Sequence, residues 1–507
     1  MTITTLLLYF AASAVLLTLL TGLVLKANKN WIVSFLQHFA GIWFFFSGAV
    51  KAVDPIGTAI KMEQYFTEFE RTFADTWLKF LSPLFPVLSK YSVAFSIIVI
   101  TLEILLGIML IIGIRRRWTA WAFFLVVVFF TVLTGFTYLT GYVTSDVNFF
   151  SFSKWGEYKS SNMRVTDCGC FGEFMKLEPY TSFLKDAVLL VPISLLFLFG
   201  SSKMHKLFNR KIRFTTTLIS LVAIVGFNYY NTAMDEPVVD FRPFKIGIDI
   251  PARRAAEEKA ASDVEILGYV LQNEKTGKTA EKRFANTAEA TKRFGEVLKE
   301  FPTEEGWKVK DQIKTEITVP HTKLSDFSVS RFDDGVEITE DVLTDSNYVF
   351  MVVSYKLLYD KMMTQTTFTP DTLWKMDTIS TVGKNKIAEI KITKTLESVS
   401  QKEETRQVFS WSAPFLTHYA NTIQPFAAAA KKAGIQTFVL TAPNDPANIK
   451  QFQEAAKLAD VPFYYTDDIV LKTIMRSNPG VVLLRKGVIV NKWHLAKLPT
   501  FNKALLK

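Results

Sequence analysis

Long runs without charged side chains are the feature that most limits how this 507-residue chain can fold. A helix that crosses a bilayer needs about 20 consecutive, mostly apolar residues. Runs that are nearly or wholly uncharged recur in the first half of the chain, at residues 1–25, 31–50, 91–114, 118–145, 181–200 and 214–234. The sequence therefore predicts a multi-pass α-helical membrane domain with six transmembrane helices.

The first run has two interpretations, a cleaved signal peptide or a retained helix. Residues 1–25 carry neither the basic leader nor the small-residue cleavage motif of a signal peptide. We therefore expect residues 1–30 to form an extra N-terminal transmembrane helix ahead of the membrane domain at residues 31–200.

Basic residues fall in alternate connections between the predicted spans. They are Lys26, Lys29, Arg115, Arg116, Arg117, Lys203, Lys206, Arg210, Lys211 and Arg213. Because short loops rich in Lys and Arg stay in the cytoplasm, we expect these loops on the cytoplasmic side of a bacterial inner membrane. Residues 51–86, residues 144–180 and everything after residue 234 then lie on the periplasmic side.

The amino-acid composition changes after Met234. Charged residues become dense, and no later apolar run is long enough to span a membrane. We expect a basic loop and the sixth span at residues 201–234, and an extracytoplasmic linker region of mixed structure at residues 235–344. A soluble α/β domain follows at residues 345–507. The net charge of +10 is also typical of nucleic-acid binding. The basic residues gather at the membrane faces, however, so we expect contact with membrane lipid and no nucleic-acid binding.

The last part of the chain alternates strands and helices. Tyr348–Tyr355 is apolar almost throughout, as a buried central strand is. The order of elements resembles a thioredoxin fold with an insertion at about residues 356–411. In that family the proline before the last hairpin is cis, and Pro479 has the matching position before a hairpin at residues 481–493. No cysteine follows Cys170, so this domain lacks the CxxC motif and cannot carry out dithiol chemistry itself.

The only two cysteines, Cys168 and Cys170, are separated by one glycine in an outer loop. Two cysteines are too few for a disulfide-stapled scaffold. Gly169 has no Cβ, so the backbone can fold tightly enough to bring the sulfurs together. A disulfide across one residue would be strained and would gain little from constraining the unfolded chain. We interpret the pair as redox-active; a local structural bridge is an alternative, and metal ligation would need two more ligands.

Two charged residues mark the outer end of the second run, which reads FSGAVKAVDP at residues 46–55. Lys51 and Asp54 are three apart, so they would share a face of a continuing helix. In one interpretation Lys51 extends to the interface and Asp54 ends the span. In the other, the two residues are a charged pair that shapes a site beside the cysteine loop.

Three further ionisable residues fall within spans: Glu103 in the third, and Lys185 and Asp186 at the start of the fifth. An ionisable group in a span must face protein or water, because burial in lipid is costly. We expect Glu103 to pair with Lys51 or Lys185 or to relay a proton. Together with Lys51 and Asp54, these residues are candidates for proton handling or quinone contact. The five histidines show no metal-binding spacing, so we expect no metal site.

Three motifs carry a family resemblance: FSGAVKAVDP at residues 46–55, LEILLG at 102–107 and DCGCFG at 167–172. Together they resemble the DoxX/MauE superfamily of small four-helix membrane proteins, over about residues 31–200. Further motifs resemble a longer subgroup with a degenerate thioredoxin-like tail; they lie at residues 241–247, 325–329, 334–339 and 348–355.

The resemblance implies a redox function. MauE-type members are linked to disulfide formation in a partner protein, and DoxX-type members to thiol homeostasis or quinone-linked oxidation. It implies that Cys168 and Cys170 exchange a disulfide with an extracytoplasmic thiol or thioredoxin-like protein, with electrons passing to a membrane quinone and no covalent cofactor. The alternative is a non-catalytic membrane-anchored scaffold whose thioredoxin-like domain binds a partner protein.

Overall fold

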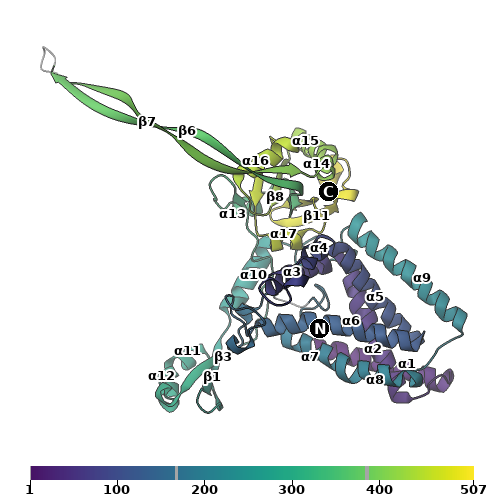
Figure 1. The fold of residues 1–507 in the computed structure, drawn as a ribbon. Coiled ribbons are helices and arrows are strands. Elements are labelled where there is room, and N and C mark those ends of the chain that lie inside the picture. The colour runs from purple at the N-terminus through teal and green to yellow at the C-terminus, as the bar shows by residue number, and fades with distance from the viewer. Residues whose placement is uncertain (1, 166–168, 383–387, 507) are drawn as a thin grey trace. The chain divides into compact units, whose positions relative to one another are not determined.

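The computed structural model describes residues 2–165, 169–382 and 388–506, and side chains within these ranges except at 367–404 and 406. Figure 1 shows the elements along the chain. They divide into two compact units. The first comprises Met1–Ile248, Lys472–Gly480 and Asn491–Leu498, and the second comprises Asp249–Leu471, Val481–Val490 and Pro499–Lys507.

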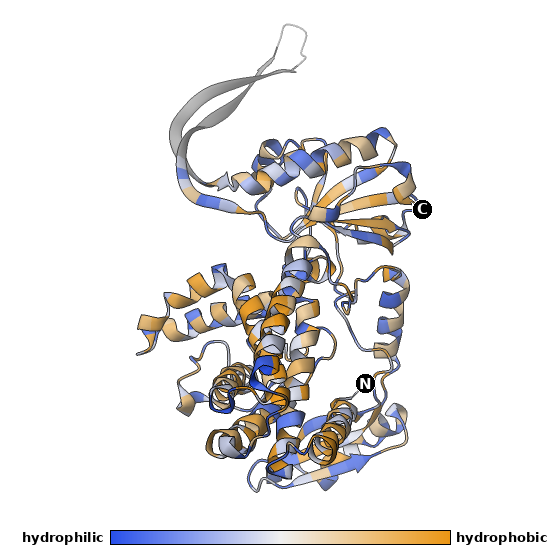
Figure 2. Cartoon of the chain, turned by 90° about the vertical axis from the view of Figure 1, so that its right-hand side faces the viewer, coloured by the Kyte–Doolittle hydropathy of each residue, from blue (hydrophilic) through white to orange (hydrophobic). Residues whose placement is uncertain are grey.

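Within the described residues, the first unit contains six helices that are long and apolar enough to cross a membrane, as predicted. They are Ile3–Val24 (α1 and η1), Trp31–Val53 (α2), Ser92–Ile112 (α5), Arg116–Thr140 (α6), Pro179–Lys203 (α7, η5, α8 and η6) and Arg210–Met234 (α9 and η7). Apolar residues dominate these helices in Figure 2. Pro192 lies in the π-helical segment η5 (Leu189–Ser194), because a proline lacks the amide hydrogen that a regular helix needs.

Shorter helices lie between the spans. They are α3 (Pro55–Ala74), η2 (Lys79–Leu81), α4 (Leu84–Lys90), η3 (Phe152–Lys154) and η4 (Ser160–Asn162). The helix α3 is amphipathic and starts directly after α2. It buries Met62, Tyr65 and Phe66 in an aromatic cluster with Phe85 of α4 and Phe136 of α6. This burial holds α3 against the spans, over the ends of α5 and α6.

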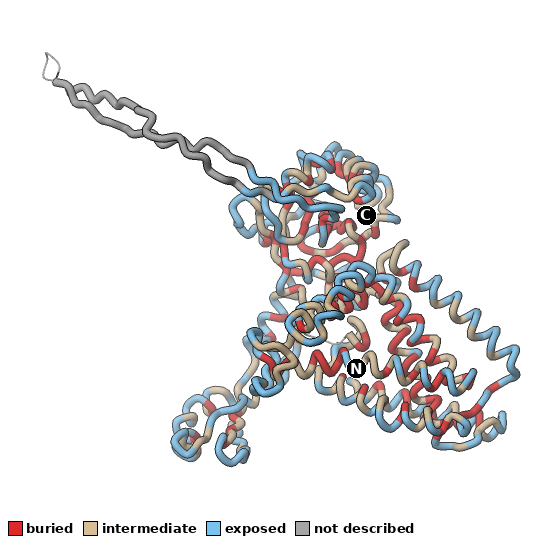
Figure 3. Tube along the Cα trace, in the orientation of Figure 1, coloured by how far each residue is buried: buried red, intermediate tan, exposed pale blue. Residues whose placement is uncertain are grey.

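The spans α2 and α5 approach closely through glycines. A Cβ atom added to Gly107 would lie 2.6 Å from the backbone nitrogen of Phe45, and one added to Gly41 would lie 3.0 Å from the carbonyl oxygen of Gly107. Small residues allow such close contact between membrane helices. By contrast, only 6% of the apolar 18-residue stretch within the sixth span is buried, as expected of a helix that faces lipid (Figure 3).

The second unit begins with α10 (Ile250–Ser262) and a small antiparallel sheet in the order β2-β1-β3. Its strands are Ile266–Asn273 (β1), Thr279–Arg283 (β2) and Trp307–Lys314 (β3). The helices α11 (Thr287–Lys292) and α12 (Phe294–Glu300) pack on it around Tyr269, Leu271 and Val297. The turn η8 (Thr303–Glu305) leads into β3.

A six-stranded mixed sheet follows, in the order β11-β10-β5-β8-β9-β4. The strands are Ser330–Arg331 (β4), Tyr348–Ser354 (β5), Gln436–Thr441 (β8), Phe463–Tyr465 (β9), Gly480–Arg485 (β10) and Val488–His494 (β11). Strand β5 is parallel to β8, and β8 to β9. Six of the seven β5 residues are buried, which confirms the predicted central strand.

Short helices connect these strands: α13 (Thr339–Thr344), α14 (Ala413–His418), η9 (Tyr419–Ile423), α15 (Gln424–Lys432), α16 (Pro446–Ala455) and α17 (Asp468–Ile474), with η10 (Leu495–Lys497) and η11 (Lys503–Leu506) near the C-terminus. The region expected to be an insertion contains a hairpin of two long antiparallel strands, β6 (Tyr359–Val382) and β7 (Ala388–Trp411). Trp411 packs edge-to-face on Phe452 of α16, with ring centroids 5.1 Å apart, and so fixes the base of the hairpin.

Candidate functional site

The cysteine loop belongs to the first unit. Cys168 lies outside the described residues, whereas Cys170 is buried, with 9% of its surface exposed. Gly169 has φ of +61°, a backbone conformation that glycine adopts most readily. The hydroxyl of Ser47 on α2 donates a 2.9 Å hydrogen bond to the backbone oxygen of Cys170. This bond ties the loop to the second span.

Cys170 lines a small cavity between the spans, with a volume of about 30 Å³. Lys51, Glu103, Lys185 and Asp186 line the same cavity. Its volume corresponds to one or two water molecules. The structure therefore brings together five of the residues singled out in the sequence, from α2, α5, α7 and the loop before α7.

Lys51 and Glu103 form a buried ion pair. The Lys51 ammonium donates to both carboxylate oxygens of Glu103, at 3.0 and 2.8 Å, and the two side chains are only 5% and 3% exposed. The ammonium also donates to the Ser47 hydroxyl at 3.2 Å and lies 4.5 Å from the ring centroid of Phe130. The pairing of Lys51 with Glu103 is one of those expected from the sequence. Lys51 is therefore buried, and it neither extends to the interface nor pairs with Asp54.

Lys185 and Asp186 form a second ion pair, with their charged atoms 2.5 Å apart. Thr134 of α6 donates a 3.0 Å hydrogen bond to the other carboxylate oxygen of Asp186. The Lys185 ammonium also lies 6.0 Å from the ring centroid of Trp43. Glu103 is thus paired with Lys51 and not with Lys185, and each carboxylate of the cavity has its own ammonium group.

Asp54 ends the second span, as one interpretation of the sequence expected, and it does not form the pair with Lys51 that its spacing suggested. Helix α2 ends at Val53, and the Asp54 carboxylate instead accepts a 2.9 Å hydrogen bond from the backbone nitrogen of Gly57 at the start of α3. It also accepts hydrogen bonds from the guanidinium of Arg476, at 2.6–2.9 Å. Burial alone would raise the pKa of Asp54, but the charge and hydrogen bonds of Arg476 outweigh it and lower the pKa below its usual value.

The charged network around Asp54 could not be expected from the sequence. Arg242 pairs with Glu236 and with Asp240, each at 2.7 Å, and the backbone nitrogen of Arg476 donates to Glu236. Lys492 pairs with Asp240 at 3.1 Å. The only sequence signal was the motif at residues 241–247, which suggested a relationship and no contact.

Two members of this network have shifted pKa values. Burial would raise the pKa of Asp240, but Arg242 and Lys492 lower it to about 2. Burial and the nearby charge of Arg242 lower the pKa of Lys492 to about 8. Asp240 is therefore ionised at neutral pH, as its partners require.

A second small cavity, of about 20 Å³, joins the network to the cysteine loop. Lys51, Asp54, Gly169, Asp240 and Arg242 all line it. Phe241 packs edge-to-face on Phe174, with ring centroids 5.3 Å apart. The segment around Phe241 therefore covers the cysteine loop and places charged groups next to it.

The buried residues His38 and His205 stack on each other elsewhere in the first unit, with ring centroids 4.4 Å apart. The Thr18 hydroxyl donates to the carbonyl oxygen of Ala14, so Nδ1 of His38 must donate to Thr18. Nε2 of His205 likewise donates to the carbonyl oxygen of Ile111. Both rings are tied to helices in this way. Among the described residues, no three His, Cys, Asp or Glu side chains gather to hold a metal ion.

The cavity beside Cys170 does not fit a quinone. Its volume of about 30 Å³ is far below the roughly 300 Å³ at which small-molecule pockets begin. A larger apolar cavity of about 300 Å³ lies among Phe69, Phe136 and Phe183, but Cys170 is not among the residues that line it. We therefore assign no step to a quinone at the cysteine site.

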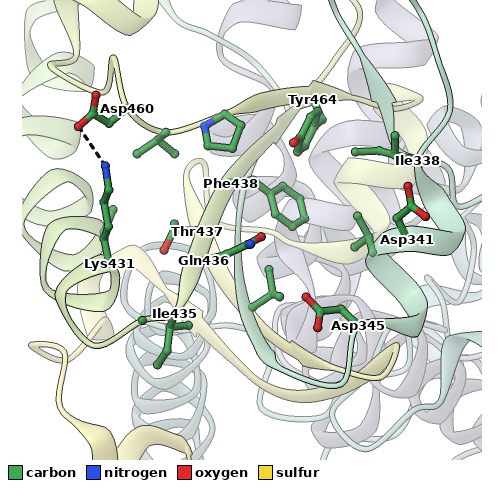
Figure 4. A pocket seen from close by; sticks show the side chains of 16 residues that line it. Ile338, Asp341, Asp345, Lys431, Ile435, Gln436, Thr437, Phe438, Asp460 and Tyr464 are labelled. Atoms are coloured by element: carbon green, nitrogen blue, oxygen red, sulfur yellow. Dashed lines mark hydrogen bonds and ion pairs between the residues drawn. The ribbon is translucent and has the colours of Figure 1, made fainter.

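The second unit has a wider cavity of about 560 Å³ (Figure 4). Lys431 and Asp460 form an ion pair of 3.1 Å at one side of it, and Asp341 and Asp345 lie at the other.

The peptide bond that precedes Pro479 is cis, as expected from the sequence.

Comparison with known proteins gives one match. Residues 29–146 match the family model described as methylamine utilisation protein MauE. The matched region runs from α2 through α6 and includes Lys51, Asp54 and Glu103, but not the cysteine pair. No curated protein and no solved structure matches the chain. The protein is therefore a membrane protein with a region similar to the MauE family.

Proposed function

We propose that this protein exchanges disulfides with a partner protein through Cys168 and Cys170. One observation carries the proposal: Cys170 lines a buried cavity together with the ion pairs Lys51–Glu103 and Lys185–Asp186. A loop bridge that served only stability would not need three buried charges and the part-buried Lys185 beside it, because taking charges out of water is costly.

The exchange balances without any further reactant. A thiolate of the partner attacks one sulfur of the Cys168–Cys170 disulfide, and a mixed disulfide forms as the other cysteine leaves as a thiolate. The partner's second thiolate then attacks the mixed disulfide. The partner loses two electrons and gains a disulfide, and the cysteine pair gains two electrons and leaves as two thiolates, which take up the two protons that the partner's thiols released.

The cavity brings two ammonium groups to the cysteine loop. An unpaired ammonium group near a cysteine lowers the pKa of its thiol, and a thiol of lower pKa leaves faster. The ammonium groups of Lys51 and Lys185 both line the cavity of Cys170, and each is paired with a carboxylate there, so a thiolate would share these ammonium groups with Glu103 and Asp186. Ser47 holds the loop in register with Lys51, because its hydroxyl bonds to both.

The proposal also covers where the cysteine loop lies and which part of the chain binds the partner. The distribution of basic loops favours a six-span protein of the bacterial inner membrane with the cysteine loop on the periplasmic side. The resemblance to DoxX/MauE proteins supports a thiol-redox function. The mixed sheet of the second unit would be a thioredoxin-like module without cysteines that binds the partner.

The reduction potential of the pair tests the function. The purified full-length protein would be equilibrated in dithiothreitol and glutathione redox buffers, and its thiols counted by mass after maleimide labelling, with Cys168→Ser/Cys170→Ser as the control. Redox-active pairs have potentials of about −120 to −270 mV, whereas structural disulfides lie below about −300 mV. We expect a value in the first range; a value below −300 mV, or thiols that never form a disulfide, contradicts the proposal.

A second experiment tests the orientation. Intact cells would be treated with a membrane-impermeant maleimide before and after mild reduction. Labelling that depends on reduction is the expected result for an oxidised periplasmic pair, and labelling only after cell lysis contradicts the orientation.

A binding module is the second candidate function, and the cavity of about 560 Å³ in the second unit favours it. That volume lies within the range of about 300–1,000 Å³ typical of ligand sites. The protein would then be a membrane-anchored scaffold. Partner binding that survives Cys168→Ser/Cys170→Ser but is lost in Asp345→Lys would support this function over the first.

A further inference from the structure

A large open cavity lies where three membrane spans of the first unit end. It has a volume of about 1190 Å³ and lies between the start of α6, the end of the fifth span and the start of α9. Seven basic side chains line it: residues 115–117, which are all arginine, and Lys206, Arg210, Lys211 and Arg213. None of the residues that line it is acidic.

The positive charges of this basic cavity are not compensated within it. The guanidinium of Arg116 lowers the pKa of Lys206 below its usual value, and partial burial, Arg213 and Lys29 act in the same direction. The Nε atom of Arg213 is buried and has no hydrogen-bond acceptor among the described residues. Seven cations that repel one another favour an anionic ligand.

Two of the cations are held in place by the backbone. Arg116 donates to the carbonyl oxygens of Ser202 and Met204, at 2.8 and 2.7 Å. Arg213 donates to the carbonyl oxygen of Phe208 at 2.8 Å. The helices α6 and α9 both begin here, so the positive ends of their dipoles add to the field. The site is therefore positioned before a ligand arrives.

Apolar walls adjoin the cations. Phe199 is 87% exposed and Phe214 is 59% exposed, and both line the cavity with Leu198 and Ile114. A soluble anion would make no use of these side chains. A molecule with an anionic head and hydrocarbon chains matches both parts of the cavity, and basic pockets between membrane helices are known to bind such headgroups.

We propose that this basic cavity binds an anionic phospholipid, with its phosphate against the arginines and its acyl chains along Phe199 and Phe214. This is a specific site, distinct from general contact with the bilayer, and it does not depend on the proposed redox function. The chemical class of the ligand follows from the pairing of seven cations with exposed aromatic walls.

Native mass spectrometry of the full-length protein in non-ionic detergent tests the site. The probes are dioleoyl phosphatidylglycerol, tetraoleoyl cardiolipin, dioleoyl phosphatidylcholine and inorganic pyrophosphate. The test variant is Arg117→Gln/Lys206→Gln/Arg210→Gln, which spares the anchoring residues Arg116 and Arg213. The matched control, Lys26→Gln/Lys90→Gln/Lys203→Gln, removes the same charge from positions that do not line the cavity.

We expect the anionic lipids to bind at least tenfold more tightly than phosphatidylcholine, and this preference to fall at least tenfold in the test variant but less than threefold in the control. Equal losses in both variants would mean general charge attraction and would overturn the proposal. Phe199→Ser should weaken lipid binding and leave pyrophosphate binding unchanged, and the unchanged pyrophosphate binding also shows that the variant is folded. Pyrophosphate that binds as tightly as the lipids would identify a soluble anion as the ligand and would also overturn it.

Discussion

Removal of one partner of the Lys51–Glu103 pair should strongly destabilise the first unit. At 2.8 Å, the attraction between two unit charges is roughly 6 kcal/mol for an effective dielectric constant of about 20. Much of this attraction offsets the cost of taking both groups out of water. If one partner is removed, the other charge stays buried without compensation, which typically costs about 3–5 kcal/mol.

A double-mutant cycle separates this cost from loss of packing. Lys51→Met keeps most of the aliphatic stem and removes the ammonium that lies over Phe130, and Glu103→Leu fills a similar volume with apolar atoms. We expect each single variant to lower the free energy of unfolding by about 3–5 kcal/mol. The double variant should lie within about 1–2 kcal/mol of the wild type, because it leaves no unpaired charge.

Unfolding in mixed micelles, followed by circular dichroism as the denaturing detergent is increased, gives these free energies. Lys90→Met, at an exposed lysine of α4, is the control and should change the free energy by less than about 0.5 kcal/mol. Additive effects of the two substitutions, or single variants that cost less than about 1 kcal/mol, would refute the reasoning.

Three further predictions follow from the structure. Gly107→Ala should destabilise the protein by about 1–3 kcal/mol, since its Cβ would meet backbone atoms of α2, whereas Gly226→Ala, with nothing within 4 Å, should be neutral in the same unfolding assay. The pKa of Asp240 is lowered to about 2, so ionised Asp240 stabilises the folded protein fully at any pH above its usual pKa. About 2 kcal/mol of the free energy of unfolding should be lost as the pH falls from 4 through 2. Melting curves recorded against pH should show this loss in the wild type and not in Asp240→Asn. Lys185→Met leaves the Asp186 carboxylate of the cysteine cavity without its ammonium partner, so it should raise the pH midpoint for alkylation of reduced Cys170; an unchanged midpoint would argue against electrostatic control of this thiol by the cavity.

Local properties of the sequence were sufficient to predict the membrane helices and to single out four charged residues that line the cysteine cavity. Each span is a continuous apolar run, and a helix in a bilayer satisfies its own backbone hydrogen bonds, so its position follows from composition. Glu103 and Asp186 stood out because a carboxylate within a span needs a partner. The sequence left the partner of Glu103 open between Lys51 and Lys185, because composition does not say which helices are neighbours.

The charged network around Arg242 could not be predicted in this way. Asp54 and Arg476 are 422 positions apart, and nothing in the local sequence of either residue points to the other. The expected pair of Lys51 and Asp54 was wrong for a local reason. A spacing of three residues places two side chains on one face only while the helix continues, and Asp54 begins the next helix, α3. The stacked pair His38 and His205 was missed because the two residues are far apart in the sequence.

The ion pairs of the cysteine cavity also determine how it responds to the voltage across the membrane. One charge moved through 100 mV changes the energy by about 2.3 kcal/mol. The opposite charges of Lys51 and Glu103 are 2.8 Å apart, about a tenth of a hydrocarbon core of roughly 30 Å, so the pair experiences at most about 0.2 kcal/mol. The pair Lys185–Asp186 is equally short. The resting cavity is thus nearly insensitive to voltage, and only a step that leaves a single unpaired charge there would respond to the membrane potential.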